Sequence, residues 1–161
     1  MNKPIIAALM LAGAAIPLAS CGSEAEQPAE AAPANTIAGI EITNARLVLP
    51  PVAGNPAAVY FDLANKGDRS VTFRNATVEG AGRAEMHQSI MEGDKMVMGE
   101  AHPQTIQPGS SLEFAPGGMH IMVFELPEDM AAGGTAEVTL VAAGNKPHSF
   151  TAEIQAAGDD R

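Results

Sequence analysis

The apolar segments after residue 36 are short, and this pattern restricts the fold more than any other feature of the sequence. Turn residues separate them, as at Pro116-Gly117-Gly118. No stretch keeps a helical period of 3.6 residues between two caps. The pattern predicts an all-β domain, either an antiparallel sandwich or a barrel. The expected strands are 40–42, 57–63, 71–78, 84–90, 95–99, 111–114, 119–126, 136–142 and 149–154.

Residues 1–20 have the pattern of a secretory signal peptide. Lys3 gives a positive start, and the apolar run 5–16 that follows is too short to span a bilayer as a helix. Cys21 comes directly after Leu18-Ala19-Ser20, which resembles a bacterial lipoprotein processing site. We therefore expect export and a lipid on Cys21. The simpler alternative is an ordinary cleavage site beside an incidental thiol.

Three further boundaries follow from composition. Residues 21–36 are rich in Ala, Pro and Glu and are expected to form a lipid-anchored flexible linker. Residues 37–155 form the predicted β domain. Residues 156–161 are expected to be a disordered tail.

Cysteine content and charge exclude several classes of function. With Cys21 as the only cysteine, the domain has no disulfide framework and no thiolate for a zinc or blue-copper site. A net charge of −10 argues against nucleic acid as a partner. No pattern places two carboxylates together, sets a nucleophile beside a base or cradles a phosphate, so we do not expect an enzyme.

Methionine and histidine cluster in the middle of the chain. Seven of the nine methionines lie between residues 86 and 130, together with three of the four histidines. In the expected strand 119–126, His120 and Met122 are two residues apart and share a face. Taken alone, this pair is more typical of a neutral outer face, because an isolated His-x-Met is common.

A predicted hairpin supplies a second pair of the same kind. If Glu92-Gly93 is a two-residue loop between 84–90 and 95–99, then Met91 pairs with Asp94, and His87 lies opposite Met98. Two imidazoles and two thioethers form a soft, uncharged ligand set that favours Cu(I) over Zn²⁺, Mg²⁺ or Ca²⁺. The sequence thus predicts a Cu(I) site formed by His87, Met98, His120 and Met122.

The remaining methionines are possible neighbours of this site. Met86 alternates away from His87 and is expected to fill the core, while Met96 falls on the His87 face as a spare ligand or hydrophobic rim. Met91 and Met119 are expected to shield the site from water. His102 and His148 are expected to be ordinary surface histidines, and the nearby acidic residues to be solvated; these are Glu85, Glu92, Asp94 and Glu100.

The spacing resembles a known family. The pattern H-x10-M-x21-H-x-M, read at His87, Met98, His120 and Met122, is that of the PCuAC family of periplasmic copper chaperones, and the resemblance covers about residues 40–154. It implies a cupredoxin-like Greek-key sandwich in which these four residues hold Cu(I). It also implies delivery of copper for the cytochrome c oxidase copper centre, with a Sco-like thiol protein or cytochrome c oxidase subunit II as the acceptor. With a lipid on Cys21, the protein would lie in the periplasm, anchored to the inner or outer bacterial membrane.

Two other functions stay open on the sequence. The chain could be a structural or adhesive lipoprotein with an incidental Met/His cluster. It could also be an electron-transfer copper protein, although blue-copper sites need a thiolate and Cys21 lies before the linker.

Overall fold

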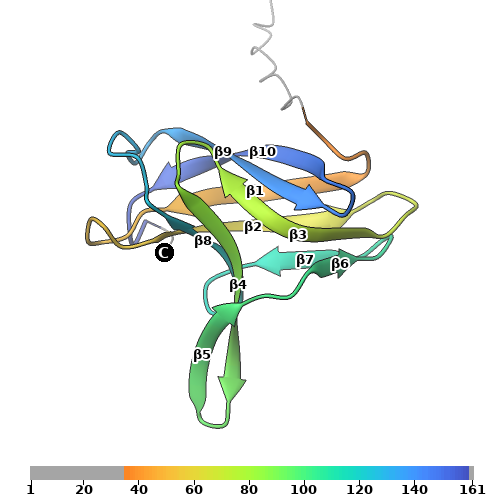
Figure 1. The fold of residues 1–161 in the computed structure, drawn as a ribbon, viewed down its shortest axis with the longest axis horizontal. Helices are drawn as coiled ribbons and strands as arrows, with labels where there is room; N and C mark the ends of the chain where they lie inside the picture. Colours follow the sequence, from red (N-terminus) through yellow and green to blue (C-terminus); the bar gives the residue numbers. More distant parts are fainter. Residues whose placement is uncertain (1–34, 160–161) are drawn as a thin grey trace, which may run out of the picture. The chain divides into compact units, whose positions relative to one another are not determined.

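The computed structural model describes residues 35–159, which contain ten β-strands (Figure 1). The strands are β1 Ile40–Val48, β2 Ala57–Asn65, β3 Val71–Val78, β4 Arg83–Glu92, β5 Lys95–Glu100, β6 Gln104–Ile106, β7 Ser111–Phe114, β8 Met119–Phe124, β9 Thr135–Ala142 and β10 Lys146–Gln155. The predicted signal peptide, the lipidation site Cys21 and nearly all of the predicted linker lie outside the described residues. None of the described segments is a helix that could cross a bilayer.

All nine predicted strands are present, and the differences concern short or irregular segments. The sequence pattern missed β6, which has only three residues. It also ended the first strand too early, because β1 continues to Val48 across an irregularity between Thr43 and Arg46. Asn44 adopts a positive φ of 55° there, which interrupts the alternation that marks a strand.

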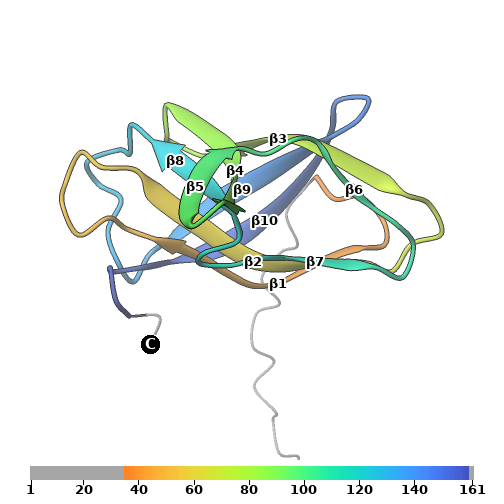
Figure 2. The same cartoon turned by 90° about the horizontal axis from the view of Figure 1, so that it is seen from below.

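The strands form one curled sheet in the order β5-β4-β8-β7-β2-β1-β10-β9-β3-β6, with an added pairing of β8 to β2. Most neighbours are antiparallel, whereas β1 pairs with β10 and β7 with β8 in parallel. Figure 2 shows β1, β2 and β7 on one side of the sandwich and β3 and β9 on the other. The predicted all-β sandwich is confirmed.

The core lies between these two sides and is built from alternating strand positions. In β2 every second residue from Ala57 to Asn65 is buried. Phe61 stacks on Phe114 of β7, with ring centroids 4.1 Å apart, and lies 4.9 Å from the ring of Phe150 of β10. Burial of such side chains contributes roughly 1.5–3 kcal/mol each, so this domain is stabilised by its apolar core.

The β4–β5 hairpin extends beyond the rest of the sheet (Figure 1). The pairing of β4 with β8 ends at Gln88 and Met119, and beyond the hydrogen bond from the Ser89 N–H to the Gly118 carbonyl, residues 89–92 pair only with β5. We call residues 89–98 the hairpin arm. The two-residue loop at its tip is Gly93-Asp94, since Glu92 pairs with Lys95.

The predicted Glu92-Gly93 loop is therefore wrong by one residue. Gly93 has a φ of 64°, a left-handed conformation that glycine adopts without strain. A two-residue hairpin loop with glycine in its first position has this geometry, whereas the predicted loop would have placed Glu92 there. The error shifts the partner of every hairpin residue by two positions, so that His87 pairs with Glu100 and not with Met98.

Candidate metal centre

Strands β4 and β8 bring His87 and His120 together as direct cross-strand partners. Their ring centroids are 6.0 Å apart with an interplanar angle of 52°. His120 is buried and His87 is half-buried. The two imidazoles that the sequence separates by more than thirty residues thus share one face of the sheet.

One nitrogen of each imidazole is fixed by a neighbouring acceptor. His87 Nε2 lies 3.1 Å from a carboxylate oxygen of Glu85, and His120 Nδ1 lies 3.1 Å from the carbonyl oxygen of Gly118. Both neighbours only accept hydrogen bonds, so we assign the imidazole protons to these two nitrogens. The lone pairs then lie on His87 Nδ1 and His120 Nε2.

These two lone-pair nitrogens are buried, and neither has a hydrogen-bond partner. A buried acceptor without a partner is costly, whereas a bound cation would satisfy it. A carboxylate or backbone carbonyl on the far nitrogen is also the usual support of a metal-binding histidine. The donor set therefore fits a metal ion.

Burial lowers the pKa of His120, and the positive charge that His87 would carry lowers it further, while the Gly118 carbonyl raises it. The net direction is downward, so His120 is neutral near pH 7. A neutral imidazole is the form that binds a metal.

The two predicted methionine ligands lie on the same face. Met122 pairs with Glu85, which shares the His87 face of β4. Met98 pairs with Ser89, which also shares that face. Because of the corrected loop, Met98 is the diagonal neighbour of His87 rather than its direct partner, about 7–8 Å away at the backbone and within reach of a long side chain.

The other methionines divide into two groups. Met91 and Met96 are direct partners on the His87 face of the arm and are exposed. Met86 and Met119 are buried in the core on the opposite face, as predicted for Met86. For Met119 this placement argues against the predicted shielding role, because the pleat directs its side chain away from His120.

Sequence reasoning missed Glu85, which was expected to be solvated. It contacts His87 and also forms an ion pair of 2.8 Å with Arg83, whose guanidinium lies 4.2 Å from the ring centroid of Phe124. The signal was present in the sequence, because a residue two positions before a histidine in a strand shares its face.

Residues 35–159 contain no group of three or more His, Cys, Asp or Glu side chains that could hold a metal ion. The same face presents the thioethers of Met98 and Met122, which are soft ligands.

Comparison with known proteins places the chain in a family. The family model described as "Putative lipoprotein LpqE-like" matches residues 40–154. The chain belongs to the LpqE-like lipoprotein family. A curated relative, "Putative lipoprotein Lxx21020" of Leifsonia xyli subsp. xyli (strain CTCB07), is 30% identical over 129 residues, which cover 79% of this chain and 76% of the relative.

Solved structures with the same fold include PCuAC domains. The copper-bound PCuAC domain from PmoF2 superposes with a TM-score of 0.61 at 21% identity, covering 75% of this chain and 96% of that domain. The Cu(I) form of DR1885 from Deinococcus radiodurans gives a TM-score of 0.53 at 23% identity, covering 85% of this chain and 89% of the other. The likeness confirms the predicted cupredoxin-like sandwich.

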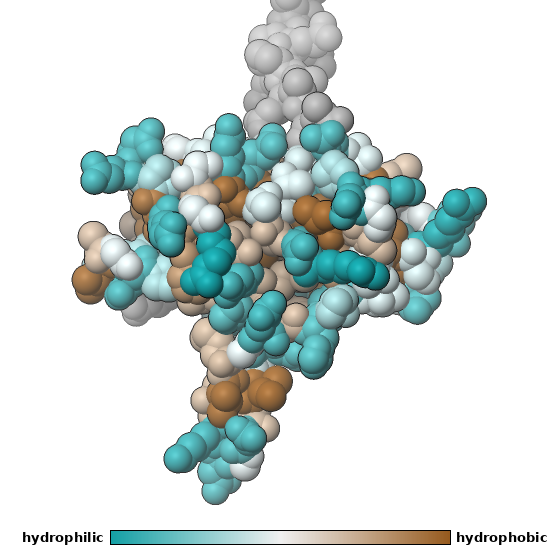
Figure 3. Space-filling view, in the orientation of Figure 1, coloured by the Kyte–Doolittle hydropathy of each residue, from teal (hydrophilic) through white to brown (hydrophobic). Residues whose placement is uncertain are grey.

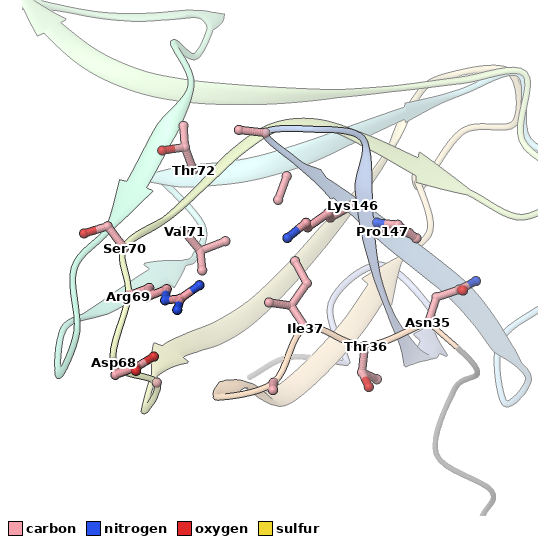
Figure 4. Close-up of a pocket in the computed structure, with 14 residues that line it drawn as sticks. Asn35, Thr36, Ile37, Asp68, Arg69, Ser70, Val71, Thr72, Lys146 and Pro147 are labelled. Atoms are coloured by element: carbon pink, nitrogen blue, oxygen red, sulfur yellow. The ribbon is translucent and has the colours of Figure 1, made fainter.

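A hollow of about 680 Å³ lies near the start of β1 and the β9–β10 turn (Figure 4). Its walls include Ile37, Arg69, Val71 and Lys146, and no histidine or methionine lines it. It offers none of the donors of the His87 face, so we do not assign the metal centre to it.

The two remaining histidines differ from each other. His102 is exposed, as predicted. His148 is buried, which contradicts the predicted surface position, and its Nδ1 accepts a hydrogen bond of 2.9 Å from the backbone N–H of Ile37. Burial lowers the pKa of His148, so it stays neutral and connects β10 to the segment before β1.

We predict that acidification destabilises the domain partly through His148. Its folded pKa lies below the unfolded value of 6.5, so below pH 6.5 the unfolded chain binds more protons than the folded one. The contribution of neutral His148 to the free energy of unfolding is then fully present above pH 6.5 and decreases as the pH falls below that value. Thermal unfolding at pH 7.5 and pH 5.5 measures the loss.

The matched variant is His148→Asn, whose amide oxygen replaces Nδ1 as acceptor but does not titrate. The variant should lose less thermal stability than the parent between pH 7.5 and pH 5.5. Part of the loss that remains is due to His120, whose pKa is also lowered in the folded protein. An equal loss in both proteins would contradict the assignment.

Proposed function

We propose that this protein is a Cu(I) carrier of the bacterial periplasm, anchored to a membrane by a lipid on Cys21. The observation that carries the proposal is the pair of buried imidazole nitrogens without partners, His87 Nδ1 and His120 Nε2, on a face that also presents Met98 and Met122. The H-x10-M-x21-H-x-M spacing and the copper-bound state of the PCuAC neighbours support the same ion. The lipoprotein family supports the anchor.

The ligand chemistry fits a carrier better than a permanent store. Two neutral imidazoles and two thioethers leave the single positive charge of Cu(I) uncompensated, and Glu85 supplies only a nearby negative charge. Met98 is 54% exposed, which leaves the ion open to exchange of ligands at that side. A thiolate binds Cu(I) more strongly than a thioether, so transfer to a thiol-rich acceptor would run downhill.

Delivery would serve the assembly of the cytochrome c oxidase copper centre. A Sco-like thiol protein or cytochrome c oxidase subunit II would be the acceptor. Four protein ligands leave no coordination position for a substrate, which favours a carrier over an oxidase. The absence of a cysteine from residues 35–159 favours it over a blue-copper electron carrier.

The test is a Cu(I) titration of the purified protein in competition with a coloured chelator, in a Cys21→Ser background that removes the thiol. We expect one tight equivalent, with nitrogen and sulfur ligands in its X-ray absorption spectrum and no comparable binding of Zn²⁺. Failure to bind a tight equivalent would reject the copper site and favour a structural lipoprotein.

Delivery is tested separately. The copper-loaded protein is mixed with a peptide that carries two cysteines, and the copper in each is measured after separation. We expect copper to move to the peptide. Retention of copper by the protein would reject the carrier role while leaving the binding site intact.

A further inference from the structure

The hairpin arm exposes an unusual set of apolar side chains. Of the six exposed large hydrophobic residues in the described part of the chain, five lie on it, and Val52 is the sixth. Figure 3 shows this apolar surface on the projecting arm, with hydrophilic residues at the tip. The five are Ile90, Met91, Met96, Val97 and Met98, with exposed fractions from 38% to 61%.

The two faces of the arm differ in chemistry. Ile90 pairs with Val97, so one face carries aliphatic side chains. The other face carries Met91 opposite Met96, with Met98 two residues further along β5. This second face is continuous with His87. All three sulfur atoms of the arm therefore lie on the side of the proposed copper site.

The spacing allows these three thioethers to meet at one ion. Directly paired residues have Cβ atoms about 4.5–5.5 Å apart, and alternate residues of a strand are about 7 Å apart. Methionine has three rotatable bonds beyond its backbone, so its sulfur can move over such distances. Thioethers are soft ligands that need no deprotonation, which matches Cu(I).

We propose that Met91, Met96 and Met98 form a second, weaker Cu(I) site on the hairpin arm, outside the His87/His120 pair. This inference rests on the proposed function. Met98 belongs to both ligand sets, so one ion passes between the arm and the buried histidines by exchanging its other ligands around that sulfur. When the histidine site is already filled, a second ion is held by Met91 and Met96 alone. The acidic residues Glu92, Asp94 and Glu100 on the hairpin add negative charge that attracts a cation.

The arm site is expected to be the weaker one for two reasons. It has no imidazole, and Met91 and Met96 are 61% and 59% exposed, so three mobile side chains must be ordered when the ion binds. Weak binding at an exposed position is what a loading or hand-over step requires, because the ion must also leave.

The experiment follows the methionine methyl groups by NMR. Protein with ¹³C-labelled methionine methyls and Cys21→Ser is titrated anaerobically with Cu(I), and the signals are assigned with single Met→Leu variants. We expect Met98 and Met122 to respond to the first equivalent and Met91 and Met96 to the second. Met86 and Met119 in the core serve as internal controls and should not respond.

A pair of matched variants tests the role of sulfur. Met91→Leu with Met96→Leu keeps the apolar volume but removes two donors, and should weaken the second step by about tenfold or more without changing the first. Ile90→Leu with Val97→Leu alters the other face of the same arm and should change neither step. The arm site is rejected if the Ile90/Val97 variant weakens the second binding step and the Met91/Met96 variant does not. It is also rejected if both variants leave the second step unchanged.

The outcomes also separate this inference from the proposed function. Response of Met98 and Met122 without any response of Met91 and Met96 would reject the arm site alone. It would leave the exposed arm as an apolar surface for a protein partner. No response of Met98 and Met122 to the first equivalent would reject both sites.

Discussion

Replacing Met98 and His120 by alanine together should weaken Cu(I) binding by more than about 100-fold, because loss of a supporting hydrogen-bond partner alone costs about 10–100-fold in a metal site. The double change removes one sulfur and one nitrogen, each from a different strand beside β4. Of the four proposed ligands, only His87 and Met122 would remain. The competition titration with a coloured chelator measures the difference between the variant and the parent.

The matched control removes the same residue types elsewhere. Met130→Ala with His102→Ala takes away one methionine and one histidine that lie outside the β5-β4-β8 face. It should bind Cu(I) as the parent does. Equal loss in the two double variants would show that the proposed ligands have no special role.

His120 is buried, so its removal also affects packing. Circular dichroism and thermal unfolding establish whether the double variant is folded. Met98→Leu alone gives a test that does not depend on that outcome, since Met98 is half exposed and leucine keeps its apolar volume. This single change should still lower the affinity measurably, and an unchanged affinity would remove Met98 from the ligand set.

The fold was predictable because its signals are local. Short apolar runs between glycine-rich turns mark strands whichever sheet they join, and only the three-residue β6 and the irregular second half of β1 gave no such signal. The order of the strands could not be derived in this way. The parallel pairing of β1 with β10 joins residues more than 100 positions apart, and no local pattern encodes it.

The common face of the four proposed ligands was predictable from the sequence, but their register was not. Side chains alternate strictly along a strand, so moving a two-residue loop by one residue changes each cross-strand partner by two positions and leaves every side chain on its face. Met98 therefore stays on the His87 face, although it pairs with Ser89 and not with His87. The direct pairing of His87 with His120 depends on how β4 meets β8, which lie far apart in sequence. Residue spacing therefore indicated which four side chains share a face, while tertiary pairing decides how they are arranged on it.

Glu85 shows what a list of ligands leaves out. Its carboxylate contacts His87 Nε2 at 3.1 Å and is held on its other side by Arg83 at 2.8 Å. It thereby fixes which nitrogen of His87 carries the proton and leaves Nδ1 free for an ion. It also places a negative charge on the face where the positive ion would bind, opposite Met122.

Changing Glu85 to alanine should therefore lower the affinity for Cu(I) by about 10–100-fold, although Glu85 is not itself a ligand. Glu85→Gln should cost less, because its amide oxygen still accepts the proton of His87 Nε2 but carries no charge. Glu137→Ala removes the same charge from an exposed position on β9 and should leave binding unchanged. If Glu137→Ala weakened binding as much as Glu85→Ala, the overall charge of the protein would explain the effect. A graded loss at position 85 alone would instead show that the orientation of His87 is set by this carboxylate, and that the site extends one hydrogen bond beyond its ligands.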